Sequence, residues 1–336
     1  MKLYLSLMSG FLAILMWFVF NVPMPLNLIS QSSDFSFGIV YSTKQAESLG
    51  LDPLITYENI LNELQPERLR IIAYWDRIEK QNGIYDFDEI DFLMNKAQEK
   101  NIKTTLIIGK KVPRWPECHI PYWLIKADSK NLEKELNEYL ALVVSRYKNY
   151  PNLEFWQIEN EPFYNFGNCS NNLLSVKELQ NEIKLVKNLD SNHPIIITSS
   201  GEMETWLRSF IYGDKVGVSL YRRFYLSTPF FESSLVYPLT PYFYQNKAIF
   251  FENIFNKELM LTEVQLEPWF DKSLKDVPIE KQFKEFDFEK FKESIVFAKK
   301  TNIDKIYLWG VEWWYYLYLN GYPEFLNYVK ENITNY

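Results

Sequence analysis

Short apolar runs alternate with longer mixed stretches from about Phe35 to the end of the chain. Continuous apolar runs of this length are typical of parallel strands that are buried on both faces. Most of the runs are followed by a stretch whose apolar residues recur at helical spacing. The pattern predicts strands at residues 36–41, 69–73, 103–109, 153–159, 194–199, 216–221, 259–263 and 305–309.

Helical spacing is clearest in three of the intervening stretches. In residues 132–147 the apolar positions follow one another at intervals of three or four, which lines one face of a helix. Residues 176–186 repeat this spacing, and Ser175 with Glu178 at their start matches a capping box. Residues 288–298 show the same spacing near the end of the chain.

Strands that alternate with helices eight times predict a single (β/α)₈ TIM barrel rather than an open doubly wound sheet. No glycine-rich phosphate loop follows the first predicted strand, which argues against nucleotide binding. No linker rich in Gly, Ser or Pro divides the chain, so we assign residues 31–336 to one barrel domain. The pattern is weakest at 224–257, where Phe, Tyr and Pro dominate.

The first 30 residues are predicted to be a hydrophobic signal or anchor segment outside the barrel. After Met1-Lys2, residues 3–20 carry no charged side chain. One basic residue before an apolar stretch is typical of a cleaved signal peptide, and the length also meets the lower limit for a retained membrane anchor. Either way we expect export, with the barrel outside the cytoplasm, secreted or held at the membrane through residues 3–20.

Cys118 and Cys169 fit an exported protein. They lie in the loops after the third and fourth predicted strands, which are neighbours in a barrel. A disulfide between them would form in an oxidising compartment, and two free buried thiols are the alternative.

Composition narrows the chemistry further. The net charge of −7 argues against a nucleic-acid binder, which would be basic. Two His and two Cys are too few for a convincing zinc site, and no Gly-x-Ser-x-Gly turn is present for a serine nucleophile. We therefore expect no metal and no organic cofactor, and acid–base chemistry that rests on carboxylates.

Two glutamates stand at the ends of two predicted strands. Glu161 follows the fourth strand and Glu263 ends the seventh. Active sites of TIM barrels form at the carboxyl ends of the strands, so both side chains are expected at the same mouth. Two carboxyl groups that face each other across a cleft are the groups that glycoside hydrolysis requires.

At these residues the chain resembles the retaining glycoside hydrolases of clan A, which include the cellulase-like family 5 and the β-galactosidase-like family 42. The resemblance spans roughly residues 35–320. Its motifs are Asn160-Glu161-Pro162, Thr262-Glu263, Leu308-Trp309 and two segments after the second strand, 73–79 and 83–87.

The resemblance implies roles for several residues. Glu161 would be the general acid/base and Glu263 the nucleophile of a double displacement that cleaves O-glycosidic bonds, with β linkages expected. Asn160 would bind the substrate 2-hydroxyl, and Arg70 and Tyr221 would position the nucleophile. The implied substrate is an oligosaccharide or polysaccharide.

Two tryptophans are expected to bind sugar. Trp309 matches the family tryptophan that forms a floor under the reacting sugar, and Trp75 follows the second strand, where an indole can stack on a sugar. Glu159 stands two residues before Glu161 and is expected to share its face, because alternate residues of a strand point the same way.

One departure from family 5 changes the substrate hypothesis. Many members carry a histidine at the end of strand three and another before the strand-six tyrosine, and this chain has neither. Basic residues follow strands three and six instead and predict a basic mouth that favours an anionic glycan: Lys110, Lys111, Arg114, Arg222 and Arg223.

Two other functions use the same residues. A carbohydrate-binding barrel that has lost catalysis would keep the aromatic side chains without turnover. A transglycosylase would use the same two glutamates with a sugar hydroxyl in place of water. The sequence does not distinguish these from hydrolysis, and it leaves the sugar, the linkage, endo or exo action and the oligomeric state open.

Overall fold

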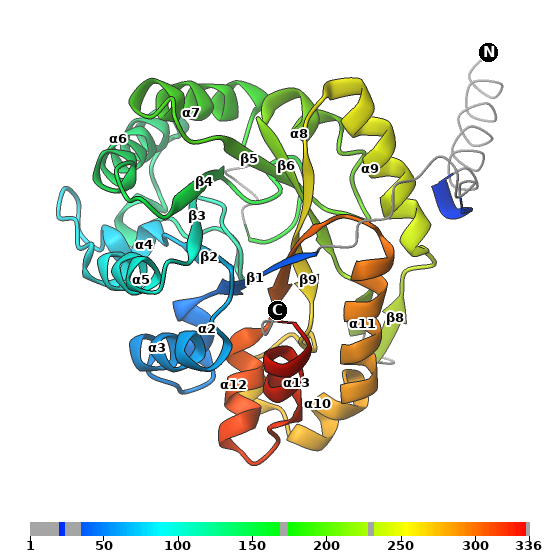
Figure 1. Cartoon of the computed structure of the whole chain (residues 1–336). Coiled ribbons are helices and arrows are strands. Elements are labelled where there is room, and N and C mark those ends of the chain that lie inside the picture. The colour runs from blue at the N-terminus through cyan, green and yellow to red at the C-terminus, as the bar shows by residue number, and fades with distance from the viewer. Residues whose placement is uncertain (1–19, 24–34, 169–173, 228–231, 334–336) are drawn as a thin grey trace.

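The computed structural model describes residues 20–23, 35–168, 174–227 and 232–333. Within these residues eight parallel strands close into a barrel in the order β1-β10-β9-β6-β5-β4-β3-β2. Helices surround the strands (Figure 1). The predicted (β/α)₈ barrel is therefore confirmed. Its strands are β1 Ser36–Tyr41, β2 Arg68–Ile72, β3 Lys103–Ile108, β4 Leu153–Ile158, β5 Ile195–Ser199, β6 Lys215–Leu220, β9 Leu259–Gln265 and β10 Lys305–Trp309.

The helices connect successive strands, and several of the connections contain two. The capping box predicted at Ser175 and Glu178 is present at the start of α7. The helices are α2 Thr43–Ser48, α3 Pro53–Leu64, α4 Trp75–Ile78, α5 Asp88–Glu99, α6 Ser129–Tyr147, α7 Val176–Leu189, α8 Leu207–Tyr212, α9 Pro241–Phe255, α10 Ile279–Glu285, α11 Phe288–Lys300, α12 Val311–Leu319 and α13 Glu324–Asn332. Short 3₁₀ turns occur at Tyr122–Leu124 and Leu274–Asp276.

All eight predicted strands are confirmed, with bounds that differ by at most two residues. The segment with the weakest pattern holds a feature that was not predicted, an antiparallel hairpin of β7 (Arg223–Ser227) and β8 (Glu232–Val236). This hairpin lies outside the barrel and precedes α9. It escaped prediction because it interrupts the strand–helix repeat on which the other assignments rest.

The barrel strands are buried on both faces, as their apolar runs predicted. One cluster fills the barrel interior and includes Ile72, Ile107, Met260 and Tyr307. A second, larger cluster fills the space between strands and helices. The Tyr307 ring lies where a side chain on Gly38 would be, because an ideal Cβ there would approach it to 2.7 Å.

Residues 20–23 lie against α9, where the Asn246 side chain donates to the Val22 carbonyl at 2.8 Å. Most of the predicted signal or anchor segment lies outside the described residues, and so does Cys169. Cys118 is disulfide-bonded. No helix within the described residues is long and apolar enough to cross a membrane.

Candidate active site

The two predicted catalytic glutamates lie at the carboxyl ends of β4 and β9, at the same mouth of the barrel. Ser219 on β6 connects them. It pairs in register with Glu263 across β6 and β9, and its hydroxyl donates to Glu161 Oε1 at 2.8 Å. The strand pairing therefore brings both carboxyl groups to one site, although 102 residues separate them in sequence.

Glu263 lies among hydrogen-bond donors. Arg70 Nη1 is 3.3 Å from its Oε1, and the Tyr221 hydroxyl donates to its Oε2 at 3.1 Å. Burial raises the pKa of Glu263, and Arg70 and Tyr221 act in the opposite direction. The structure thus places Arg70 and Tyr221 beside Glu263, where the resemblance implied they would be.

Glu161 has a different environment. Its backbone has φ of 43°, and its N–H donates to Thr198 Oγ1 at 2.8 Å. Burial and the nearby Glu263 carboxylate raise the pKa of Glu161 well above its ordinary value, while Lys111 and the Ser219 hydrogen bond lower it. A carboxyl group with a raised pKa stays protonated near neutral pH, which suits a general acid.

A chain of buried hydrogen bonds connects Arg70, which contacts Glu263, to Asn160. Arg70 Nη2 donates to Gln157 Oε1, and Gln157 Nε2 donates to Asn160 Oδ1 at 3.4 Å. Asn160 Nδ2 in turn donates to Glu117 Oε2 at 3.2 Å. The orientation of the Asn160 amide is therefore fixed from both sides.

Sequence reasoning missed four polar residues of this site. Gln157 had a detectable signal, since it is the polar residue within the buried run of β4. The other three follow from contacts between separate strands and loops, which no local pattern reveals: Glu117, Thr198 and Ser219.

Glu159 does not point into the mouth beside Glu161, so that expectation was wrong. Its carboxylate accepts the backbone N–H groups of Lys110 at 2.9 Å and Lys111 at 2.6 Å. A Cβ on Gly109 would lie 2.6 Å from this carboxyl carbon, so the close approach requires glycine. The φ of 58° at Glu159 breaks the strand alternation on which the expectation depended.

The expectation that Trp75 binds sugar was also wrong. Trp75 is fully buried between the barrel and its helices. Its ring stacks on Tyr139 with centroids 5.3 Å apart, and its indole N–H donates to Glu79 at 2.8 Å. Trp75 is a core residue, because α4 begins at this position and turns the side chain inward.

Trp309 lies at the mouth, where it closes the interior cluster and packs with Tyr221. The Arg114 guanidinium lies over its ring, 4.0 Å from the centroid. Arg114 is held there by ion pairs with Glu267 and Glu312. The role of Trp309 as a sugar floor stays a prediction, and the structure adds that one ring face packs against an arginine.

A row of aromatic rings extends from Tyr221, beside Glu263, toward solvent. Tyr221 lies 6.3 Å from Trp269, Trp269 lies 5.5 Å from Phe166, and Phe166 lies 6.1 Å from Trp115, measured between ring centroids. Trp115 is 67% exposed and Trp269 is 39% exposed. Exposed rings that continue from a catalytic residue can stack on further sugar rings.

The five residues of the predicted basic mouth are buried or engaged in contacts within the protein, and two of them, Lys111 and Arg114, lie at the mouth. Lys111 Nζ donates to the backbone carbonyls of residues 161 and 164, Lys110 is buried, and Arg114 forms the ion pairs described above. Arg222 lies over the Phe297 ring, and Arg223 lies 3.9 Å from Glu293. The preference for an anionic glycan stays a prediction.

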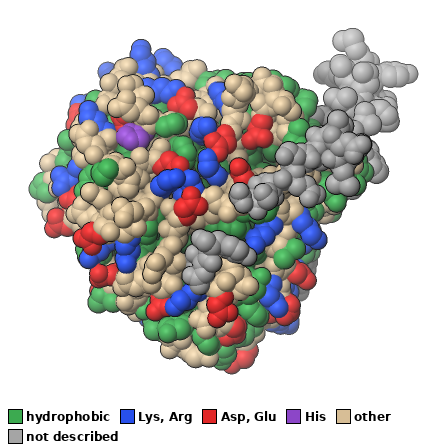
Figure 2. All heavy atoms as spheres, in the orientation of Figure 1, with side chains coloured by type: hydrophobic (Ala, Val, Ile, Leu, Met, Phe, Trp, Pro, Cys, Tyr) green, Lys and Arg blue, Asp and Glu red, His purple; other side chains and the backbone are tan. Residues whose placement is uncertain are grey.

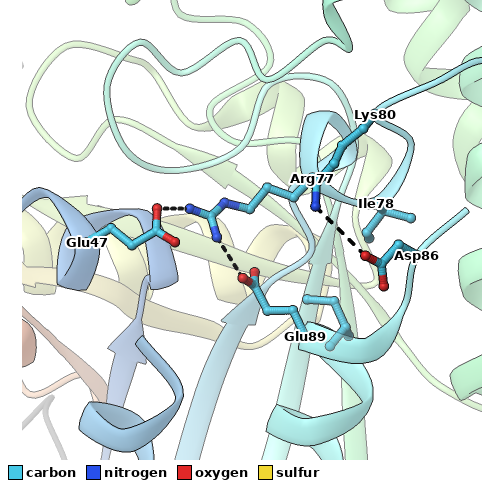
Figure 3. A pocket seen from close by; sticks show the side chains of 7 residues that line it. Glu47, Arg77, Ile78, Lys80, Asp86 and Glu89 are labelled. Carbon is cyan, nitrogen blue, oxygen red and sulfur yellow. Dashed lines mark hydrogen bonds and ion pairs between the residues drawn. The ribbon is translucent and has the colours of Figure 1, made fainter. Parts of the chain in front are cut away.

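The surface shows no separate basic face in the view of Figure 2, where basic and acidic side chains lie side by side. A hollow of about 330 Å³ lies between α2, α4 and α5 and contains none of the predicted catalytic residues. Arg77 pairs there with Glu47 and Glu89, and Lys80 pairs with Asp86 (Figure 3). The charged side chains of this hollow are therefore paired with one another.

No group of three or more His, Cys, Asp or Glu within the described part of the chain could hold a metal ion. The arrangement at the mouth consists instead of two carboxyl groups with different partners, an amide beside them and aromatic rings. Two such carboxyl groups are suited to proton transfer and nucleophilic attack.

Comparison with known proteins agrees with this arrangement. Residues 33–179 match the model of glycosyl hydrolase family 10. This stretch contains β1 to β4 and Glu161, and it ends before β9 and Glu263. The match confirms the resemblance to clan A glycoside hydrolases, and it supports a glycoside hydrolase as the class of enzyme.

Solved structures of the same clan share the fold. GH5_18 from Streptomyces cattleya is 12% identical, with 83% of this chain and 71% of that chain covered and a TM-score of 0.55. Xylanase 10B from Thermotoga petrophila is 14% identical, with 82% of each chain covered and a TM-score of 0.54. A β-galactosidase from Marinomonas ef1 is 11% identical, with 81% and 53% covered and a TM-score of 0.55. Identities this low establish the fold alone.

Proposed function

We propose that the protein is a retaining glycoside hydrolase that cleaves β-linked O-glycosidic bonds with Glu161 and Glu263. The observation that carries the proposal is the contrast between the two carboxyl groups. Glu161 has a pKa raised well above its ordinary value by burial and by Glu263. Glu263 receives hydrogen bonds from Arg70 and Tyr221, which favour its ionised form.

The mechanism follows from these environments. Glu161 protonates the leaving glycosidic oxygen while Glu263 attacks the anomeric carbon and forms a glycosyl-enzyme. Glu161, now ionised, removes a proton from water, which attacks the anomeric carbon and releases Glu263. In the glycosyl-enzyme Glu263 is esterified and uncharged, so it no longer raises the pKa of Glu161, and Glu161 can act as a base in the second step.

Asn160 and the aromatic rings give the site its sugar-binding groups. Asn160 is oriented by Gln157 and Glu117, and this fixed amide is suited to bind the sugar 2-hydroxyl. Trp309 and the row from Tyr221 to Trp115 supply stacking surfaces. Structures of similar fold hold GlcNAc and xylobiose, which supports an oligosaccharide or polysaccharide substrate.

Azide rescue tests the two roles separately. With a dinitrophenyl glycoside, whose leaving group needs no proton, Glu161→Ala should form the glycosyl-enzyme, and azide should then release it as the β-glycosyl azide. Glu263→Ala should yield the α-glycosyl azide by direct displacement. Azide products of the same anomeric form from both variants would contradict the assignment.

The proposal includes export, with the barrel outside the cytoplasm, either secreted or anchored through residues 3–20. It is supported by the uncharged run at 3–20 and by the disulfide-bonded state of Cys118, since disulfides persist in oxidising compartments. The intact mass of the protein from its native cells distinguishes cleavage near residue 30 from a retained segment. A reduced Cys118 in cytoplasmic fractions would contradict export.

A carbohydrate-binding barrel without turnover and a transglycosylase remain the competing functions. The same azide experiment separates the first, because a non-catalytic barrel yields neither azide. Product analysis at high sugar concentration separates the second, because transglycosylation yields longer oligosaccharides in place of the free sugar.

A further inference from the structure

Glu117 is a third carboxyl group in the active site, and the chain holds it there at some cost. Its backbone has φ of 72°, a left-handed conformation that is strained for a non-glycine residue. Its N–H donates to the Arg114 carbonyl at 2.7 Å, and its own carbonyl accepts from Val112 at 2.9 Å. A Cβ on Gly167 would lie 2.5 Å from Glu117 Cβ, so the loop after β4 packs directly on it.

The Glu117 side chain faces the place where the reacting sugar must lie. Its Oε2 accepts the hydrogen bond from Asn160, and the side chain is electrostatically coupled to both Glu161 and Glu263. Only 8% of Glu117 is exposed. Burial raises its pKa to about 8, and the charge of Glu263 acts in the same direction, while the charges of Lys111 and Arg114 and the Asn160 hydrogen bond lower it.

Within the described residues no ion pair reaches the Glu117 carboxylate. The two nearby cations are held by other groups, since Lys111 Nζ donates to backbone carbonyls and Arg114 pairs with Glu267 and Glu312. With its raised pKa, Glu117 is largely protonated near neutral pH when no ligand is bound, and a ligand that brings a cation into contact with it favours the ionised form. The site therefore favours a positively charged group on the sugar.

Among sugars, a free amino group provides that charge. Resting on the function proposed above, we propose that Glu117 is a specificity-determining residue that selects a reacting sugar with a free amino group beside the Asn160 amide, a 2-amino-2-deoxy sugar. The ammonium would donate to Glu117 where a neutral sugar presents a hydroxyl. An N-acetylated amine carries no charge and gains nothing from this carboxylate.

The alternative is that Glu117 only positions Asn160. Glu117→Gln separates the two roles, because the glutamine carbonyl still accepts the Asn160 hydrogen bond while the negative charge is gone. Glu138→Gln is the matched control, since it removes the same charge from the exposed surface of α6. Both changes are made in the full chain with Glu161→Gln, which blocks turnover and allows binding to be measured.

Binding is measured by calorimetry with pairs of methyl β-glycosides that differ only at carbon 2: glucosamine and glucose, galactosamine and galactose, and mannosamine and mannose, with the N-acetyl forms included. In the best-bound configuration we expect the amine to bind at least about tenfold more tightly than the hydroxyl sugar, or ~1.4 kcal/mol. Glu117→Gln should reduce this ratio to within about twofold and leave the affinity for the hydroxyl sugar nearly unchanged. Glu138→Gln should keep the ratio.

Three results would overturn the proposal: no preference for the amine in the parent, a preference that survives Glu117→Gln, or an equal loss of affinity for both sugars, which marks a positioning role alone. Failure of the proposed function is distinguishable, because in that case neither azide product forms, whichever of the sugars bind.

Discussion

Ser219 donates its hydroxyl hydrogen to Glu161 Oε1 at 2.8 Å from a strand position that pairs with Glu263. This serine stands two residues before Tyr221, where many family 5 enzymes carry a histidine. It therefore contacts the proposed acid from the strand that also positions the nucleophile's tyrosine. A neutral hydroxyl in this place can orient Glu161 without adding a charge that titrates near neutral pH.

Replacing Ser219 tests whether this hydrogen bond controls the acid. The bond lowers the pKa of Glu161, so Ser219→Ala should raise that pKa. Glu161 acts in its protonated form, and activity is lost as pH rises through its pKa. The alkaline limb of kcat/KM should therefore move to higher pH, with about a tenfold loss at the optimum from poorer orientation. Ser219→Thr keeps a hydroxyl and should restore the wild-type limb; an unmoved limb in Ser219→Ala would show that the contact is incidental.

Tyr221→Phe should change the acid limb of the pH profile of kcat/KM. The Tyr221 hydrogen bond lowers the pKa of Glu263, so its loss should raise that pKa. Glu263 attacks as the carboxylate, and activity is lost as pH falls through its pKa. The acid limb of kcat/KM should move to higher pH, and kcat should fall roughly 10- to 100-fold. If only the alkaline limb moved, the roles of the two glutamates would have to be exchanged.

Substitutions of Trp75 and Trp309 should differ in their effects on stability and on kcat/KM. Trp75→Phe removes the hydrogen bond to Glu79 and part of the stacking on Tyr139, so we expect about 1–3 kcal/mol lower stability with little change in kcat/KM. Trp309 also packs in the interior cluster and against Arg114, so Trp309→Phe should lower stability by about 1 kcal/mol and, unlike Trp75→Phe, lower kcat/KM at least about tenfold. Thermal unfolding and steady-state kinetics on both variants check this, and the reverse pattern would return Trp75 to the site.

The aromatic row predicts dependence on substrate length. Trp269→Ala should raise KM about tenfold for an oligosaccharide, because stacking on one ring is worth roughly 1 kcal/mol or more, and leave KM for a short aryl glycoside almost unchanged. Tyr122→Ala is the control, since Tyr122 is 88% exposed and lies in the same loop as Trp115. Equal effects of the two substitutions, or equal effects on both substrates, would exclude the row as a binding surface.

The fold was predictable because its signal is local. Strands such as β1 and β10 are short apolar runs buried on both faces, and their predicted bounds agree with the structure. Glu161 and Glu263 could be placed because strand ends in a barrel converge on one mouth, and Asn160, Arg70 and Tyr221 could be placed through the resemblance to clan A enzymes. The hairpin β7–β8 could not, because it belongs to no repeat.

Side-chain direction was the harder problem. Glu159 was placed in the mouth by strand periodicity and Trp75 by its place after the second strand, but a positive φ at Glu159 and an early helix at Trp75 turn both side chains away. Glu117 was missed because its position depends on the packing of two loops, which the sequence does not specify. Errors of this kind arise where a strand ends and its alternation stops.

The central claim is that Glu263 forms a covalent bond to the sugar. The most direct measurement treats the full chain with a panel of activated 2-fluoroglycosides that includes gluco, galacto and manno configurations, followed by intact mass and peptide mapping. The account predicts a single sugar adduct on the peptide that contains Glu263, absent in Glu263→Ala and formed at wild-type stoichiometry in Tyr122→Ala. An adduct on Glu161, or turnover of the parent sugars with inversion and no adduct, would contradict it.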